Sequence, residues 1–346
     1  AFYSNTTGSD NTAVGAHALD ANTTGVENVA IGRHAMADNT TGSSNVAIGH
    51  QALDDNTTAS GNVAIGNHAL MNNHDGTNLV AIGDQALETL GTSSSSNTAI
   101  GAHSMQSSTN AEDCVAVGSL ALFANTSGSK NTAVGANALD ANTTANKNTA
   151  VGYNSMTATT TGNDNVGVGA FTLNANVQGA NNVAVGQNAL GVNQSGSQNT
   201  AIGSLALDAN TTSANNVAVG YNALTAQTTG TQNVAVGSAA GSNLITANSS
   251  VAIGYAALSS NTGAHGNTAV GANALQLATG SGNVAIGSSA GKNQTTANYN
   301  VTIGQIAGND ITTGGANIAI GYHALGEVTT TGNHTAVGHT ALAQCT

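Results

Sequence analysis

The strongest constraint on this chain is a 17-residue repeat that continues along the whole sequence. The string Asn-Thr/Val-Ala-Val/Ile-Gly begins at Asn11 and returns at Asn28, Asn45 and Asn62. Its glycine occurs twenty times; seventeen of the nineteen spacings equal this period, one is a residue longer and one is a residue shorter. Numbered from the first Asn as positions 1 to 17, the consensus is N-[TV]-A-[VI]-G-x-x-A-L-x-x-N-T-T-G-x-x. Such a period indicates stacked, similar units rather than ordinary globular domains.

The residue types in the repeat favour β-structure. Large β-branched residues at positions 2 and 4 flank an alanine at position 3, as in Val29, Ala30 and Ile31, which is the alternation of a strand. Gly, Asn, Thr and Val dominate the unit and are weak helix formers. We therefore predict an all-β, parallel β-solenoid of about twenty coils, with residues 1–346 as one continuous array. Both ends fall in mid-repeat, so we expect a segment of a longer assembly.

Individual positions predict local structure. Because both faces of the strand are apolar, we expect it to be buried on both sides. The glycine at position 5 predicts a turn with positive φ, and the asparagine at position 1 predicts a ladder of stacked amides. Position 9 is usually Leu but is Gly at Gly241, Gly291 and Gly308, where we expect weaker coils.

The alanine stripe at position 3 predicts contact between chains. A small apolar stripe beside larger residues suggests that another chain packs against it. The residues we expect at this contact are Ala13, Ala30, Ala47, Ala64, Ala133, Ala150, Ala184, Ala201, Ala218 and Ala235.

Composition excludes several classes of function. The chain has 4 basic and 16 acidic residues, a net charge of −12, so it lacks the cationic surface that nucleic-acid binding needs. No apolar run is long enough to predict a membrane span. The sequence carries no P-loop or C-x-x-C motif. We therefore expect neither an enzyme nor a cofactor.

The motif Asn-Val-Ala-Ile-Gly-x-x-Ala, at residues 28–35 and 62–69, resembles the YadA-type head repeat of trimeric autotransporter adhesins. Similar arrays with Asn-Thr-Thr-Gly occur in tail-fibre-like proteins of phages and aquatic bacteria. The resemblance covers the whole chain, although the adhesin repeat is shorter. It implies a left-handed β-roll in a homotrimeric fibre, with the alanine face toward the trimer axis.

Histidine is the one residue type that suggests a metal. Position 7 holds His17, His34, His68, His103 and His323, and in a trimer one such position would bring three imidazoles together. No carboxylate or cysteine recurs with them at ligand spacing, so we expect a polar, ladder-type position, with these residues as weak metal candidates.

The Asn-Thr-Thr turns also match the N-glycosylation motif. Turn chemistry explains them equally well, because Asn and Thr satisfy backbone groups locally. The candidate attachment residues are Asn5, Asn22, Asn39, Asn56, Asn125, Asn142 and Asn210.

These features predict a structural extracellular fibre or adhesin shaft, on a cell surface or a virion. We expect a homo-oligomer, a homotrimer that stacks end to end, with a carbohydrate or host-surface receptor as a partner. Two alternatives remain: a glycan-coated filament subunit, and an ice-binding solenoid that uses threonines at positions 13 and 14.

Overall fold

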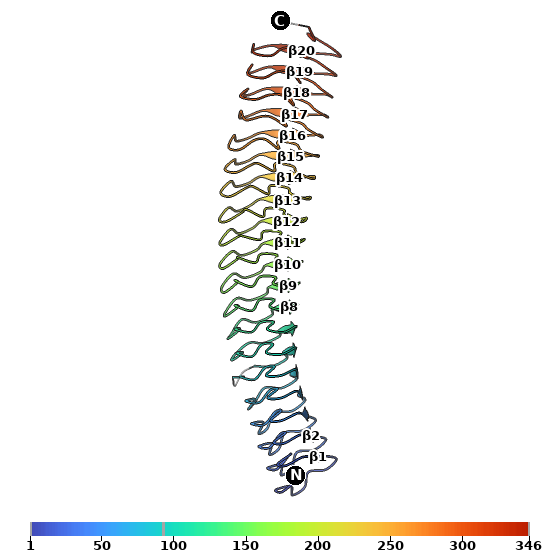
Figure 1. Cartoon of the computed structure of the whole chain (residues 1–346), viewed down its shortest axis with the longest axis vertical. Helices are drawn as coiled ribbons and strands as arrows, with labels where there is room; N and C mark the ends of the chain where they lie inside the picture. Colours follow the sequence, from blue (N-terminus) through green and yellow to red (C-terminus); the bar gives the residue numbers. More distant parts are fainter. Residues whose placement is uncertain (1, 92–93, 345–346) are drawn as a thin grey trace. The chain divides into compact units, whose positions relative to one another are not determined.

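The computed structural model describes residues 2–91 and 94–344 and confirms a parallel β-solenoid of 17-residue coils. No helix occurs among these residues, and hence none that could cross a membrane. The chain forms two compact units, residues 1–178 and 179–346. Within each unit, successive coils stack with their strands in one row (Figure 1).

Each strand has three residues and occupies positions 2 to 4 of the repeat. The strands of the first unit are β1 (Thr12–Val14), β2 (Val29–Ile31), β3 (Val46–Ile48), β4 (Val63–Ile65), β5 (Val80–Ile82), β6 (Thr98–Ile100), β7 (Val115–Val117), β8 (Thr132–Val134), β9 (Thr149–Val151) and β10 (Val166–Val168). Those of the second unit are β11 (Val183–Val185), β12 (Thr200–Ile202), β13 (Val217–Val219), β14 (Val234–Val236), β15 (Val251–Ile253), β16 (Thr268–Val270), β17 (Val284–Ile286), β18 (Val301–Ile303), β19 (Ile318–Ile320) and β20 (Thr335–Val337).

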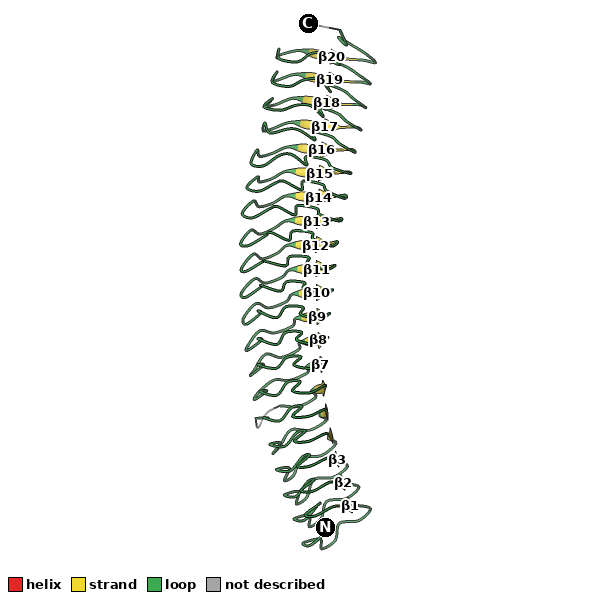
Figure 2. Cartoon of the chain, in the orientation of Figure 1, coloured by secondary structure: helices red, strands yellow, loops and turns green. Residues whose placement is uncertain are grey.

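Neighbouring strands within a unit pair in parallel and in register, so each residue lies beside its counterpart one repeat away. In the pair of β3 and β4, for example, Ala47 lies beside Ala64 and Ile48 beside Ile65. The rest of each coil has no regular secondary structure (Figure 2). Vertical hydrogen bonds still tie it to the next coil, as from the Leu53 amide to the Ala69 carbonyl, 2.9 Å.

Positive φ angles bend the coil. All twenty position-5 glycines have φ between 122° and 141°, a region that essentially only glycine enters, which confirms the predicted turn. Three further positions that the sequence pattern did not indicate are left-handed: position 7 (Asn137, φ 56°), position 9 (Leu139, φ 53°) and position 17 (Lys147, φ 56°).

The strand has one buried face and one outer face. The alanines at positions 3 and 8 and the leucine at position 9 point inward, as with Ala47, Ala52 and Leu53, which are fully buried. The residues at positions 2 and 4 point outward and are half-buried or exposed, as with Val46 and Ile31. The prediction of a strand covered on both sides is therefore wrong for a single chain, because the coil encloses only the alanine side.

Two ladders of buried asparagines run through the interior. At position 1 the Asn28 Oδ1 accepts the backbone N–H of Asn45, 3.0 Å, and the Asn45 Nδ2 donates to the Ala59 carbonyl, 2.9 Å. At position 12 the ladder joins side chains: Asn39 Nδ2 donates to Asn22 Oδ1, 2.9 Å. The predicted ladder at position 1 is thus present, with backbone as its main partner, and a second one lies where the sequence indicated only a turn.

The coils with glycine at position 9 are filled by other side chains. An added Cβ on Gly241 would lie 2.8 Å from a methyl carbon of Leu244, and one on Gly308 would lie 2.9 Å from a methyl carbon of Ile311. This leucine and this isoleucine stand at position 12, where the consensus has asparagine, and both are buried. The expected loss of core volume is therefore offset three positions further along the chain.

Candidate functional site

The outer strand face is an apolar surface built by repetition. Position 4 contributes a row of valines and isoleucines, and position 2 a parallel row of valines and threonines with one isoleucine, Ile318. The exposed members of the position-4 row in the second unit include Ile202, Val236, Ile253 and Ile286. Because the strands pair in register, each row is continuous along the sheet of its unit.

The alanines expected between chains lie inside the coil. Apart from Ala13, which is half-buried in the first coil, they are completely inaccessible: Ala30, Ala47, Ala64, Ala133, Ala150, Ala184, Ala201, Ala218 and Ala235. The position-3 prediction chose the wrong face of the strand. Alanine is small here because the residues of its own coil fill the space, not because another chain approaches.

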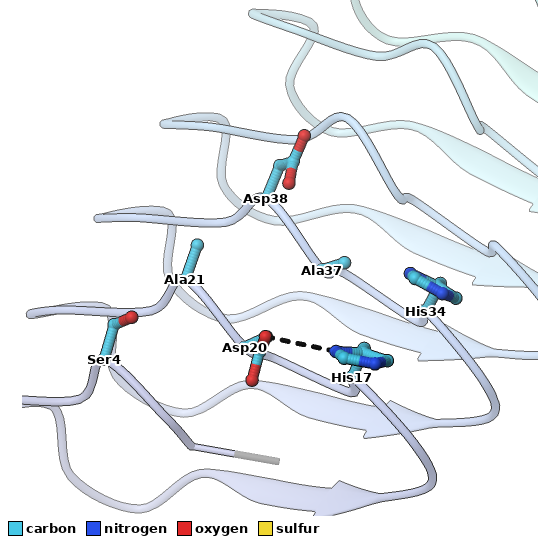
Figure 3. Close-up of a pocket in the computed structure, with 7 residues that line it drawn as sticks. All are labelled: Ser4, His17, Asp20, Ala21, His34, Ala37 and Asp38. Atoms are coloured by element: carbon cyan, nitrogen blue, oxygen red, sulfur yellow. Dashed lines mark hydrogen bonds and ion pairs between the residues drawn. The ribbon is translucent and has the colours of Figure 1, made fainter.

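The histidines of the first coils form polar contacts along one edge. His17 Nδ1 donates to Asp20 Oδ2, 3.2 Å, and the rings of His17 and His34 stack with centroids 4.9 Å apart. Figure 3 shows these residues beside Asp38 in a shallow, open hollow. Within residues 2–91 and 94–344, no group of three or more His, Cys, Asp or Glu side chains is arranged to hold a metal ion.

The other position-7 histidines make separate contacts of the same kind. His68 Nε2 lies 3.1 Å from Gln51 Oε1, and His103 Nδ1 lies 3.2 Å from Gln106 Oε1, while the ring of His323 lies beside that of Tyr322. All five histidines have φ between 53° and 57°. Histidine and asparagine tolerate this left-handed region better than most residues, so backbone geometry accounts for their frequency at position 7.

Six of the seven candidate glycosylation residues belong to the second asparagine ladder and are fully buried: Asn22, Asn39, Asn56, Asn125, Asn142 and Asn210. The Asn39 Nδ2 uses both hydrogens, toward Asn22 Oδ1 and the Gly42 carbonyl, 3.1 Å. A glycan on that nitrogen would break both bonds and has no space, so the folded chain contradicts attachment at these six residues. Asn5, in the first coil, is exposed.

Cys114 is also part of the interior. It replaces asparagine at position 1, and its Sγ donates to the Gly128 carbonyl, 3.3 Å. Burial raises the pKa of the Cys114 thiol to about 11, which makes it unreactive at neutral pH.

The structure also shows a row of exposed tyrosines that the sequence pattern did not indicate. Of the six tyrosines, four stand at position 6, directly after the turn glycine: Tyr153, Tyr221, Tyr255 and Tyr322. All four are exposed. Their shared position in the repeat was visible in the sequence, but it acquires meaning only because the structure places position 6 on the surface.

No protein-family model matches the chain, and no curated protein matches it. The fold and the surfaces described above therefore carry the functional argument.

Proposed function

We propose that this chain is a structural segment of an extracellular fibre or adhesin shaft, in which identical chains associate through the outer strand face. The observation that carries the proposal is the pair of apolar rows at positions 2 and 4. A soluble monomer seldom exposes a large contiguous apolar surface, and such surfaces usually mark interaction sites. Here the surface recurs with every coil and lacks charged residues.

Cyclic symmetry is the natural way to bury such a surface. Identical rows on several copies meet at one axis when the copies lie side by side, which closes the assembly. Association would then cover Val, Ile and Thr, while the alanines stay in the core of each chain. The adhesin resemblance favours three chains and a left-handed coil.

The interior supports a mechanical role. Each coil is tied to its neighbours by strand pairing, by backbone bonds outside the strands and by two asparagine ladders. With only 6% charged residues, the chain presents a nearly neutral surface. The ice-binding alternative loses one of its two threonine rows, because position-13 hydroxyls bond to backbone, as from Thr40 Oγ1 to the Thr57 carbonyl, 2.9 Å.

Light scattering after size exclusion tests the assembly. We expect a particle of three times the 33.5 kDa chain mass, and monomers for the double variant Ile253→Lys, Ile286→Lys, because buried unpaired ammonium groups are costly at an interface. Thr229→Lys adds a charge to an exposed turn and serves as the control that stays assembled. Circular dichroism checks the fold of each variant. A wild-type monomer at micromolar concentration, or isoleucine variants that still assemble, would refute the proposal.

A further inference from the structure

In the second unit, the residues at position 6 directly follow the turn glycine and form an exposed row along the coils, the position-6 edge. From Ser238 the row continues through Tyr255, Ala272, Ser288 and Gln305 to Tyr322, and every one of these residues is exposed. Tyr221 precedes it, two coils before Tyr255. Because every member is exposed, its side chains do not point into the core.

The rings of Tyr221 and Tyr255 are open to solvent because small residues flank them. The vertical neighbours of Tyr255 are Ser238 and Ala272, and the residue is 62% exposed. Tyr221 has serines on both sides at this position and is 56% exposed. Tyr322 is 45% exposed, since one ring face stacks on His339 with centroids 5.0 Å apart. Large exposed aromatic groups aligned along one row are typical of a binding surface.

The spacing of the rings selects an extended partner. Tyr221 and Tyr255 lie two coils apart, and Tyr255 and Tyr322 lie four coils apart. At about 4.8 Å per coil, the rings stand about 10 and about 19 Å apart along the edge. One small molecule cannot contact all three, whereas a straight polymer lying along the coils can.

The chemistry of the edge selects a neutral polymer. From Gln187 to His323, positions 6 and 7 hold no Asp, Glu, Lys or Arg side chain, so an anionic or cationic chain would find no fixed counter-charge along these two positions. Hydroxyl and amide groups stand between the rings, among them Ser238, Asn273 and Gln305. A peptide strand would need a free sheet edge for backbone pairing, but β13 to β19 are paired on both sides.

We propose that Tyr221, Tyr255 and Tyr322 form a binding edge for a linear, neutral, β-linked polysaccharide. The apolar C–H faces of the sugar rings would stack on the tyrosine rings, and the intervening hydroxyl and amide groups would bond the sugar hydroxyls. This inference gives the proposed fibre a partner and rests on that proposal. Each single contact is weak, and affinity comes from the number of rings engaged by one polymer chain.

Retention on cellulose and chitin particles tests the edge, with alginate beads as the anionic arm. We expect wild-type protein to bind at least one neutral glycan, and Tyr221→Ala, Tyr255→Ala to lose at least tenfold in affinity. Tyr299→Ala is the matched control, because Tyr299 is 72% exposed but stands at position 17; it should bind like wild type.

Failure to bind both neutral glycans, equal loss in the control, or retention on alginate alone would overturn the proposal. Light scattering on the same samples separates this result from the fate of the proposed assembly. A trimer that binds no glycan would refute the binding edge alone, whereas a monomer that binds through Tyr221 and Tyr255 would refute the assembly alone.

Discussion

The consensus substitutions Gly241→Leu and Leu244→Asn should show strong energetic coupling between positions 9 and 12 of this coil. In this coil Leu244 is 1% exposed and fills the space that a position-9 leucine occupies in its neighbours. A consensus coil has the opposite arrangement, with Leu207 at position 9 and Asn210 at position 12, both buried. The two positions therefore share one volume, which holds one large side chain at a time.

Each single change should be costly. Leu244→Asn empties the volume, and large-to-small core substitutions cost about 2–5 kcal/mol. Gly241→Leu places a side chain 2.8 Å from Leu244 Cδ1; overpacking costs about 1–3 kcal/mol. Its φ of 57° adds about 1–2 kcal/mol for a residue with a Cβ. Additive behaviour would then destabilise the double variant by about 7 kcal/mol.

The double variant should instead lose only about 1–2 kcal/mol, the left-handed backbone cost. It restores one large side chain, and the asparagine amide introduced by Leu244→Asn would reach Gln227 Oε1, which is buried without a hydrogen-bond partner. The assay is urea unfolding of wild type, both single variants and the double variant, combined as a double-mutant cycle. A coupling energy below about 1 kcal/mol would refute the shared volume.

Three further predictions concern turn, ladder and thiol. Gly271→Ala should lower the unfolding free energy by about 3 kcal/mol, because φ is 137° and the new Cβ would lie 2.5 Å from the Gly287 carbonyl oxygen. Its control, Gly266→Ala, has φ 67° and open space around the new Cβ, so it should cost about 1 kcal/mol. Hydrogen exchange of the Thr268–Val270 amides measures the difference, and equal exchange in the two variants would contradict the prediction. Asn39→Ala removes two donated bonds from the buried ladder and should lower the unfolding free energy by about 3 kcal/mol, which urea titration measures. The folded-state pKa of Cys114, about 11, lies above that of an unfolded thiol, about 8.5. The contribution of the protonated thiol to stability is therefore full below about pH 8.5 and is lost as pH rises toward 11. Cys114→Asn should not show that loss, and identical curves of unfolding free energy against pH for the two proteins would refute the assignment.

The repeat determined the fold class because its information is redundant. Twenty copies in register specify parallel stacking, and a position that is always glycine at the end of a strand indicates a backbone that no other residue adopts. The turn at position 5 and the amide ladder at position 1 were predictable for this reason. Left-handed backbone at position 9 was not, because leucine there satisfies the core at the expense of its own conformational preference.

Which face of the strand turns inward was decided only by the tertiary structure. Alternation separates Ala30 from Val29 and Ile31, but it is symmetric and does not say which side the coil encloses. The narrow interior admits alanine against the leucine of position 9, so the larger residues lie outside. The same closure buried Asn39, which the local sequence presents as a surface turn, and it brought tyrosines from separate coils onto one edge. A side chain is enclosed by residues of its own coil and of the next coil, which come together only when the coil closes. The linear pattern specifies the spacing of side chains but not the direction in which the coil closes.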